Sequence, residues 1–183
     1  MVRTKTKKKA TVEDYMKLPE GANYQLIEGE IVEWYSQEKN KMASPKIIHQ
    51  DMVGEIYRLI ANYLAINKIG RVFIAPTDVH LSDENIYQPD ILFVTNKKSN
   101  IINETAIYGT PDLIIEVIST GTKQYDLKIK MRNYEKNGVL EYYIIDPEDK
   151  EVIAYYLVQG KFKEHYRELG YIDSKILDKR FDF

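Results

Sequence analysis

The chain has 183 residues, with 26 Lys and Arg against 28 Asp and Glu, and a formal net charge of −2. This is the length of one ordinary domain, and a hydrophobic content of 44% excludes a disordered chain. Cysteine is absent, which excludes disulfides, zinc–thiolate sites and cysteine nucleophiles. The near-neutral charge argues against a protein that coats nucleic acid indiscriminately, but it leaves room for one local nucleic-acid site.

The first ten residues, MVRTKTKKKA, are basic and are followed by no apolar segment. We therefore expect residues 1–10 to form a basic flexible tail rather than a secretory signal. No apolar stretch approaches the roughly 18 residues that span a bilayer. The expectation is a cytoplasmic protein without a membrane partner, folded as a single domain over residues 11–183.

The first predicted elements are a β-hairpin and a long helix. Residues 24–33 place apolar pairs on both sides of the turn Glu28-Gly29, which is typical of a hairpin. Ser44-Pro45 offers an N-cap and a first-turn proline, so a helix is expected from there to about Asn67, with Gly70 as its stop signal. Its buried stripe is formed by apolar residues at helical spacing: Met52, Ile56, Leu59, Ile60 and Tyr63.

The rest of the chain predicts strands around a second helix. Residues 112–118 read DLIIEVI, a nearly continuous apolar run typical of a central strand covered on both faces. A helix is expected over residues 123–136, ending at Asn137-Gly138. A polar turn is expected at residues 82–85. The other predicted strands cover residues 71–75, 77–81, 89–94, 139–146, 151–158 and 162–167.

This order of elements predicts an α/β fold (an α+β mixed sheet), with a central mixed sheet that carries at least one helix on each face. The strand–helix–strand run over residues 112–146 predicts a right-handed parallel crossover.

Two carboxylates stand out against this apolar pattern. Glu116 lies inside LIIEVI, where a charge needs a cation, a metal ion or a proton; a buried salt bridge explains it equally well. Asp90 follows Pro89 at the head of the strand ILFV. Two strand carboxylates that meet at one sheet edge would form an oxygen site suited to Mg²⁺ or Mn²⁺, with the Val117 backbone carbonyl as a third ligand.

A cation follows in the second helix. Lys130 lies about 60° from the centre of the predicted buried stripe, so its ammonium group could point toward the carboxylates. The simpler alternative is an i,i+4 ion pair with Asp126. Secondary candidates for the site are His49, Glu55, Asp78 and Asp126, although a core position for His49 and a surface position for Glu55 are the simpler interpretations.

An ordered set of motifs resembles a known family. These motifs occupy most of the chain from about Thr11 onward: YQLIEGE (24–30), His49-Gln50, APTDV (75–79), PDILFV (89–94), PDLIIEVIST (111–120) and YDLKIKMRNYEKNGVLEYYIID (125–146). Together they resemble the bacterial Uma-two family of endonucleases, which is similar to the PD-(D/E)XK nuclease superfamily. The resemblance implies a restriction-endonuclease-like core.

The resemblance also implies roles for individual residues. Asp90 and Glu116 match the two acidic positions, and the Val117 carbonyl joins them on Mg²⁺ or Mn²⁺. The chain departs from the superfamily pattern at Ile118, where a lysine is usual; the family places its lysine in the next helix, at Lys130. It also has Gln25 where the family commonly has Glu.

The implied activity is metal-dependent hydrolysis of phosphodiester bonds in DNA. Many nucleases of this fold pair up to cut both strands, so a homodimer is a further expectation. Two alternatives stay open from the sequence. One is a catalytically silent binding or assembly module that kept the fold, and the other is a nuclease acting on RNA or another phosphodiester.

Overall fold

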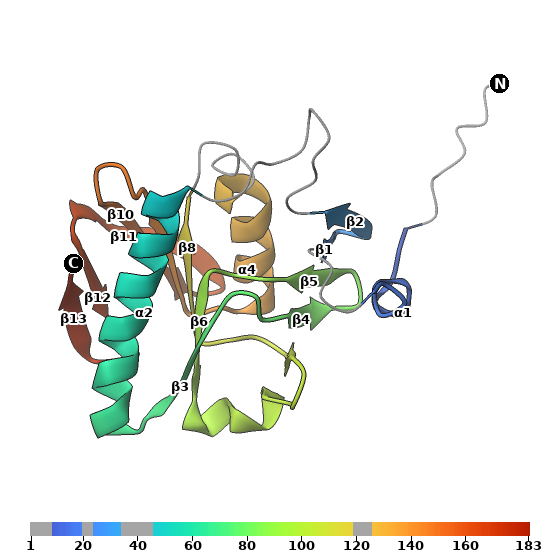
Figure 1. Cartoon of the computed structure of the whole chain (residues 1–183), viewed down its shortest axis with the longest axis horizontal. Coiled ribbons are helices and arrows are strands. Elements are labelled where there is room, and N and C mark those ends of the chain that lie inside the picture. The colour runs from blue at the N-terminus through green and yellow to red at the C-terminus, as the bar shows by residue number, and fades with distance from the viewer. Residues whose placement is uncertain (1–8, 20–23, 34–45, 119–125) are drawn as a thin grey trace.

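A computed structural model of the chain describes residues 9–19, 24–33, 46–118 and 126–183. Its main element is a six-stranded mixed sheet with the strand order β11-β10-β9-β8-β6-β3 (Figure 1). Strands β8 and β9 are parallel, and every other pair in this sheet is antiparallel. The strands are β3 (Gly70–Ile74), β6 (Ile91–Thr95), β8 (Leu113–Val117), β9 (Glu141–Ile145), β10 (Glu151–Val158) and β11 (Lys161–Leu169).

Helices cover both faces of this sheet, as the sequence predicts. Helix α2 (Ile47–Asn67) packs Ile56 and Ile60 into one core with Ile115 of β8. Helix α4 (Met131–Asn137) packs Tyr134 into a second core with Ile114 of the same strand. Because successive strand residues point to opposite faces, the continuous apolar run of β8 serves both cores.

A second, five-stranded sheet lies on the α4 side, with the order β2-β1-β5-β4-β7. Its strands are β1 (Tyr24–Ile27), β2 (Glu30–Glu33), β4 (Val79–Ser82), β5 (Asn85–Tyr87) and β7 (Ile107–Tyr108). The predicted hairpin is confirmed: Glu28 and Gly29 both have positive φ, 50° and 81°, as a two-residue hairpin turn requires. The sequence did not predict β5, β7 or a second sheet, and the polar turn at 82–85 connects β4 to β5.

The boundaries of α2 differ in part from the prediction. The helix begins at Ile47 with Lys46 as its N-cap, and Ser44-Pro45 lie outside the described residues. It ends at Asn67 as predicted, but Gly70 as the stop signal is wrong, because Lys68 takes the left-handed C-cap position (φ 45°). Gly70 instead begins β3, where a Cβ atom would lie 2.3 Å from the Val94 carbonyl oxygen.

The second helix has two parts. The described portion begins as a π-helical turn, η2 (Asp126–Lys130), and continues directly as α4; residues 119–125 lie outside the described chain. Gly138 ends it in the left-handed conformation (φ 84°), as predicted. Among the described residues, no helix is long and apolar enough to cross a membrane.

Short elements complete the fold at each end. A C-terminal hairpin, β12 (Tyr171–Ser174) and β13 (Lys179–Asp182), was not predicted and joins the core beneath α2 through Ile172 and Phe181. A single-turn helix, α1 (Val12–Tyr15), packs beside β1, and a short 3₁₀ helix, η1 (Asn96–Ile101), follows β6. Of the predicted tail, Ala10 donates a backbone hydrogen bond to Gly29 and Lys9 pairs with Glu84, while residues 1–8 lie outside the described chain.

Candidate active site

Glu116 points from the central strand β8 toward the α4 side of the sheet, together with Ile114 and Ile118. Its side chain is buried, at 2% relative exposure. Oxygen Oε1 lies 2.8 Å from the Lys130 ammonium nitrogen and accepts a hydrogen bond of 2.7 Å from the Tyr134 hydroxyl. The structure therefore compensates this buried charge with a cation and a hydroxyl.

Lys130 stands where η2 passes into α4, and it is itself only 3% exposed. Tyr134 follows four residues later, a spacing that puts both side chains on one helix face above Glu116. Burial, and next the charge of Glu116, raise the pKa of Tyr134 well above its usual value, so its hydroxyl keeps its proton and donates. The partner of Lys130 is thus a strand carboxylate, and the side chain of Asp126 lies outside the described part of the chain.

Asp90 reaches the same edge of the sheet from β6. Strands β6 and β8 pair Ile91 with Ile115, and continuing this antiparallel register places Asp90 opposite Glu116. One carboxylate oxygen of Asp90, Oδ2, accepts a hydrogen bond of 2.8 Å from the backbone N–H of Val117. The side chain of Asp90 keeps 17% relative exposure, so this end of the pair is open to solvent.

Pro89 interrupts the ladder of hydrogen bonds between β6 and β8 at Val117. In the continued register Pro89 falls opposite Val117, and a proline has no N–H to donate to the Val117 carbonyl. The N–H and C=O of one strand residue point to the same side. Because the Val117 N–H donates to Asp90, the Val117 carbonyl also points to the side of the strand where Asp90 lies.

His49 approaches this group from the first turns of α2. It is 8% exposed, and its Nε2 lies 3.3 Å from Oδ2 of Asp90. Burial alone would lower the pKa of His49. The hydrogen bond with Asp90 and its charge outweigh burial, together with a hydrogen bond to the Val117 backbone and the charge of Glu116, so the pKa of His49 is raised above its usual value. Its Nδ1 is buried and has no hydrogen-bond partner among the residues that the structure describes. The histidine thus lines the candidate site rather than filling the core alone.

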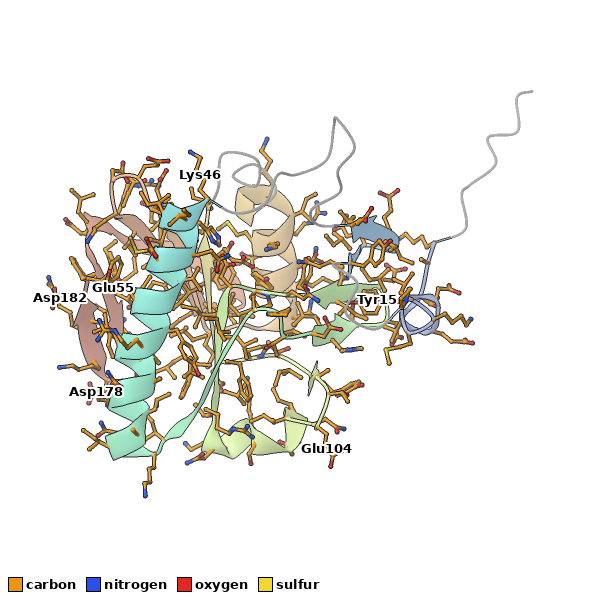
Figure 2. The ribbon with its side chains drawn as sticks, in the orientation of Figure 1. Tyr15, Lys46, Glu55, Glu104, Asp178 and Asp182 are labelled. Carbon is orange, nitrogen blue, oxygen red and sulfur yellow. The ribbon has the colours of Figure 1, made fainter. Side chains whose placement is uncertain are left out.

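The structure does not bring Glu55 or Asp78 to this place. Glu55 follows His49 by six residues on α2, so the two side chains lie about 120° apart around the helix axis. Glu55 is labelled on α2 in Figure 2. Asp78 accepts hydrogen bonds from the Tyr15 hydroxyl at 3.2 Å and from Nε2 of Gln88 at 2.8 Å. These bonds fasten α1 to the second sheet.

The donor chemistry at the sheet edge fits a hard divalent cation. Asp90, Glu116 and the Val117 carbonyl offer only oxygen, which Mg²⁺ and Mn²⁺ prefer, and Mg²⁺ commonly takes one or two carboxylates and completes its shell with water. Within the described residues no three His, Cys, Asp or Glu side chains form a metal cluster. A metal ion here would therefore depend on two carboxylates, a carbonyl and solvent.

Comparison with known proteins gives the family. A family model named Uma2 and described as "Putative restriction endonuclease" matches residues 12–178. The chain belongs to the Uma2 family. This confirms the resemblance drawn from the motifs, and the model covers both sheets and both helices that carry the candidate site.

A solved structure confirms the fold of this Uma2 protein. The crystal structure of "a putative nuclease belonging to DUF820" from Anabaena variabilis ATCC 29413 matches with a TM-score of 0.67 and 22% sequence identity. The match covers 84% of this chain and 82% of that chain. A search of curated proteins finds no match. The restriction-endonuclease-like core expected from the sequence is therefore correct.

Two residues of this Uma2 protein were missed or undervalued in the sequence. Helical spacing puts Tyr134 on the apolar stripe of the second helix, and its position four residues after Lys130 is the signal that it shares the target of the lysine. Gln25 is 3% exposed, and its Oε1 has no hydrogen-bond partner within the described part of the chain. Continuing the pairing of Leu26 with Ile86 places Gln25 opposite Tyr87 on β5.

Proposed function

We propose that the protein is a metal-dependent DNA endonuclease that hydrolyses phosphodiester bonds, with Asp90, Glu116 and Lys130 as its catalytic residues. The observation that carries the proposal is the buried ion pair of Glu116 and Lys130, at the sheet edge where Asp90 meets the Val117 backbone. Membership of a family described as "Putative restriction endonuclease" supports the same reaction class.

Asp90, Glu116 and the Val117 carbonyl would hold Mg²⁺ or Mn²⁺. When bound, such an ion lowers the pKa of a bound water and neutralises charge on the scissile phosphate. Hydrogen bonds fix both carboxylates before substrate binds. The Val117 N–H donates to Oδ2 of Asp90, and the Tyr134 hydroxyl donates to Oε1 of Glu116. Preorganised ligands avoid reorganisation during the reaction.

Lys130 supplies the positive charge of the proposed mechanism. Its ammonium group has three N–H donors, so it can keep its contact with Glu116 and still donate to the attacking water or to a phosphate oxygen. In a water-poor site such a donor stabilises the negative charge that develops on the phosphate. His49, 3.3 Å from Asp90, orients that carboxylate from the α2 side.

Plasmid nicking by the purified protein with Mg²⁺ or Mn²⁺ tests this function. Asp90→Asn and Lys130→Ala should each lower the activity by roughly 10²–10³-fold, whereas Glu55→Gln should keep it because Glu55 lies on another face of α2. Activity that survives chelation, or that is equal in all four proteins, would reject the proposal. The same assay on single-stranded DNA and on RNA separates a DNA nuclease from one with another polymer substrate.

Two further measurements complete the test. If no polymer is cut, calorimetry with Mn²⁺ decides between a nuclease whose substrate was not offered and a non-cleaving binding module, which should bind no metal ion. Light scattering at the working concentration tests the homodimer that would let two sites cut both strands.

A further inference from the structure

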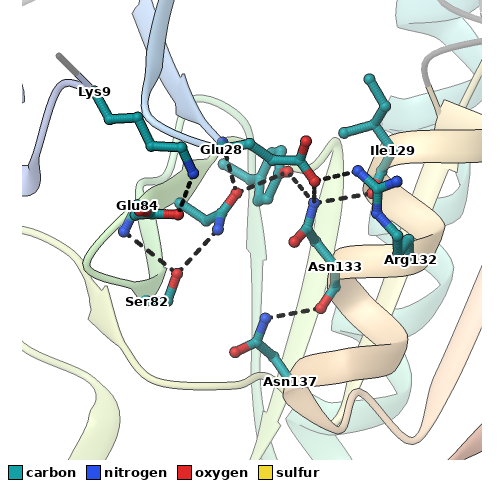
Figure 3. Close-up of polar contacts among 10 residues, drawn as sticks. Lys9, Glu28, Ser82, Glu84, Ile129, Arg132, Asn133 and Asn137 are labelled. Atoms are coloured by element: carbon teal, nitrogen blue, oxygen red, sulfur yellow. Dashed lines mark hydrogen bonds and ion pairs between the residues drawn. The ribbon is translucent and has the colours of Figure 1, made fainter. Parts of the chain in front are cut away.

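A ring of hydrogen bonds joins the turn of the β1–β2 hairpin to α4 (Figure 3). The Glu28 backbone N–H donates to Oδ1 of Asn85 at 3.0 Å, and the Tyr87 hydroxyl donates to the same oxygen at 3.2 Å. Nδ2 of Asn133 then donates to the Tyr87 hydroxyl at 3.0 Å and to Oε1 of Glu28 at 3.2 Å. The ring therefore closes on Glu28 from both its backbone and its side chain.

Asn133 is the only member of this ring that belongs to the helix, and it is 4% exposed. Arg132 adds a second, solvent-exposed contact from the helix to Oε1 of Glu28. The hydrogen bond from Arg132 is the main cause that lowers the pKa of Glu28, with Asn133 acting in the same direction. Glu28 is thus held as a carboxylate between the hairpin and the helix.

The ring also holds the backbone that carries Lys130. Nδ2 of Asn133 is 3.1 Å from the carbonyl oxygen of Ile129, which belongs to the peptide group joining Ile129 to Lys130. This peptide lies where the π-helical turn passes into α4. The two N–H groups of the Asn133 amide therefore share three acceptors: Oε1 of Glu28, the Tyr87 hydroxyl and the Ile129 carbonyl.

We propose that Asn133 is a positioning residue for Lys130, which acts by tying the Ile129–Lys130 peptide to the hairpin turn through Glu28 and Tyr87. Its effect on cleavage rests on the proposed function. Its effect on the placement of Lys130 does not, because that follows from the contacts of the amide alone.

Asn137 provides a matched control on the same helix. Its Nδ2 donates to the Asn133 carbonyl at 2.8 Å, which repeats the bond that Asn133 makes four residues back. Among its described contacts none reaches the β1–β2 hairpin. A general loss of helix stability should therefore appear in both Asn133→Ala and Asn137→Ala, and a loss of lysine placement only in the first.

The decisive measurement needs no substrate. The folded proteins are treated with a low concentration of an amine-acetylating reagent, and modification of each lysine is followed by mass spectrometry. Lys130 should react slowly in the wild type and in Asn137→Ala, and about tenfold faster in Asn133→Ala, the factor that follows from loss of roughly 1.4 kcal/mol of local hydrogen bonding. Equal Lys130 rates in the two alanine variants would overturn the proposal.

Glu28→Gln is the second variant, because its side chain is 40% exposed and its replacement threatens the fold less than a core change. It should raise the reactivity of Lys130 in the same direction and by a smaller factor. A thermal melt of each protein identifies variants that react faster only because they unfold.

Cleavage kinetics give an independent test. Asn133→Ala should lower kcat about tenfold with little change in KM, and it should have no further effect when Lys130 is already alanine. An equal loss in both backgrounds would show that Asn133 does not act through Lys130. If the wild type cuts no polymer and binds no Mn²⁺, the proposed function fails, and the acetylation experiment still decides the placement of Lys130.

Discussion

Two buried glutamates lie on neighbouring parallel strands of the central sheet, and they have different surroundings. Glu116 on β8 and Glu141 on β9 are 2% and 3% exposed. Glu141 accepts hydrogen bonds from the hydroxyls of Tyr143 and Ser174, at 2.8 and 2.7 Å, and from the backbone N–H groups of Lys175 and Ile176, at 2.9 and 3.0 Å. Glu116 instead has the ammonium group of Lys130 at 2.8 Å.

The comparison shows that burial of a carboxylate does not identify a functional site. The donors to Glu141 are neutral, and three of them come from the end of β12 and the turn after it, so this glutamate fastens the C-terminal hairpin to the sheet. Glu116 lies opposite Asp90 in the strand register and shares its surroundings with a cation. The partners of each carboxylate, rather than its exposure, distinguish the structural role of Glu141 from the role proposed for Glu116.

Replacing each glutamate by glutamine should separate the two roles most strongly. Glu116→Gln removes the charge of a proposed metal ligand, so cleavage should fall by roughly 10²–10³-fold, the range seen when one transition-state-stabilising group is lost. Glu141→Gln should keep the specific activity of the folded protein. Nicking rates, corrected for the folded fraction, test the pair; similar losses in both variants would show that the two glutamates have the same role.

Removal of Glu141 should have the largest effect on stability. Glu141→Ala leaves the Ser174 hydroxyl and two backbone N–H groups without this acceptor, and it leaves the Tyr143 hydroxyl with only the Asp173 carbonyl among its described acceptors. These losses should lower the free energy of unfolding by about 3 kcal/mol. Urea unfolding measures this, and hydrogen exchange should show β12 and β13 losing protection first. As a control, Glu148→Ala breaks, among the contacts of the described residues, an exposed ion pair with Lys46 and should change stability by less than about 0.5 kcal/mol.

Divalent metal should stabilise the fold through one glutamate and not through the other. At a free Mn²⁺ concentration of about 100 times Kd, linkage adds about 2.7 kcal/mol to the free energy of unfolding and raises Tm. Asp90→Asn and Glu116→Gln should lose this increase, whereas Glu141→Gln should retain it. Thermal melts with and without a chelator measure it, and an increase that persists in Asp90→Asn would place the metal ion elsewhere.

The sequence predicts those parts of the fold that depend on neighbouring residues. The apolar run of β8, the positive-φ turn at Glu28-Gly29 and the helix stop at Gly138 all have local physical causes, and all three are found. The second sheet was missed because its pairings join distant segments, such as Leu26 with Ile86. Its strands β5 and β7 have only three and two residues, too few to show a period.

The same limit applies to the candidate site. Glu116 stands out because a charge interrupts an apolar run, and Lys130 can be placed by its angle on a helix. The hydrogen bond of Asp90 to Val117 depends on the register of two strands 27 residues apart. Glu141 carries no local sign of its structural role, because Ser174 lies 33 residues away in a hairpin that the sequence did not predict.

The test with the smallest expected effect removes one tyrosine hydroxyl that donates to each glutamate. Tyr143→Phe deletes a donor to Glu141, and Tyr134→Phe deletes a donor to Glu116. Each change should lower the free energy of unfolding by about 1 kcal/mol, since each leaves a buried carboxylate with one hydrogen bond fewer. Urea unfolding should therefore give similar values for the two variants.

Their kinetics should differ, because only Tyr134 holds a carboxylate of the proposed active site. Tyr134→Phe should slow nicking several-fold by loosening Glu116, an effect on the order of the same 1 kcal/mol. Tyr143→Phe should leave the rate and the metal-induced rise in Tm at wild-type values. If Tyr143→Phe slowed nicking as much as Tyr134→Phe, the hydroxyls would act through general stability, and Tyr134 would have no part in the chemistry of Glu116.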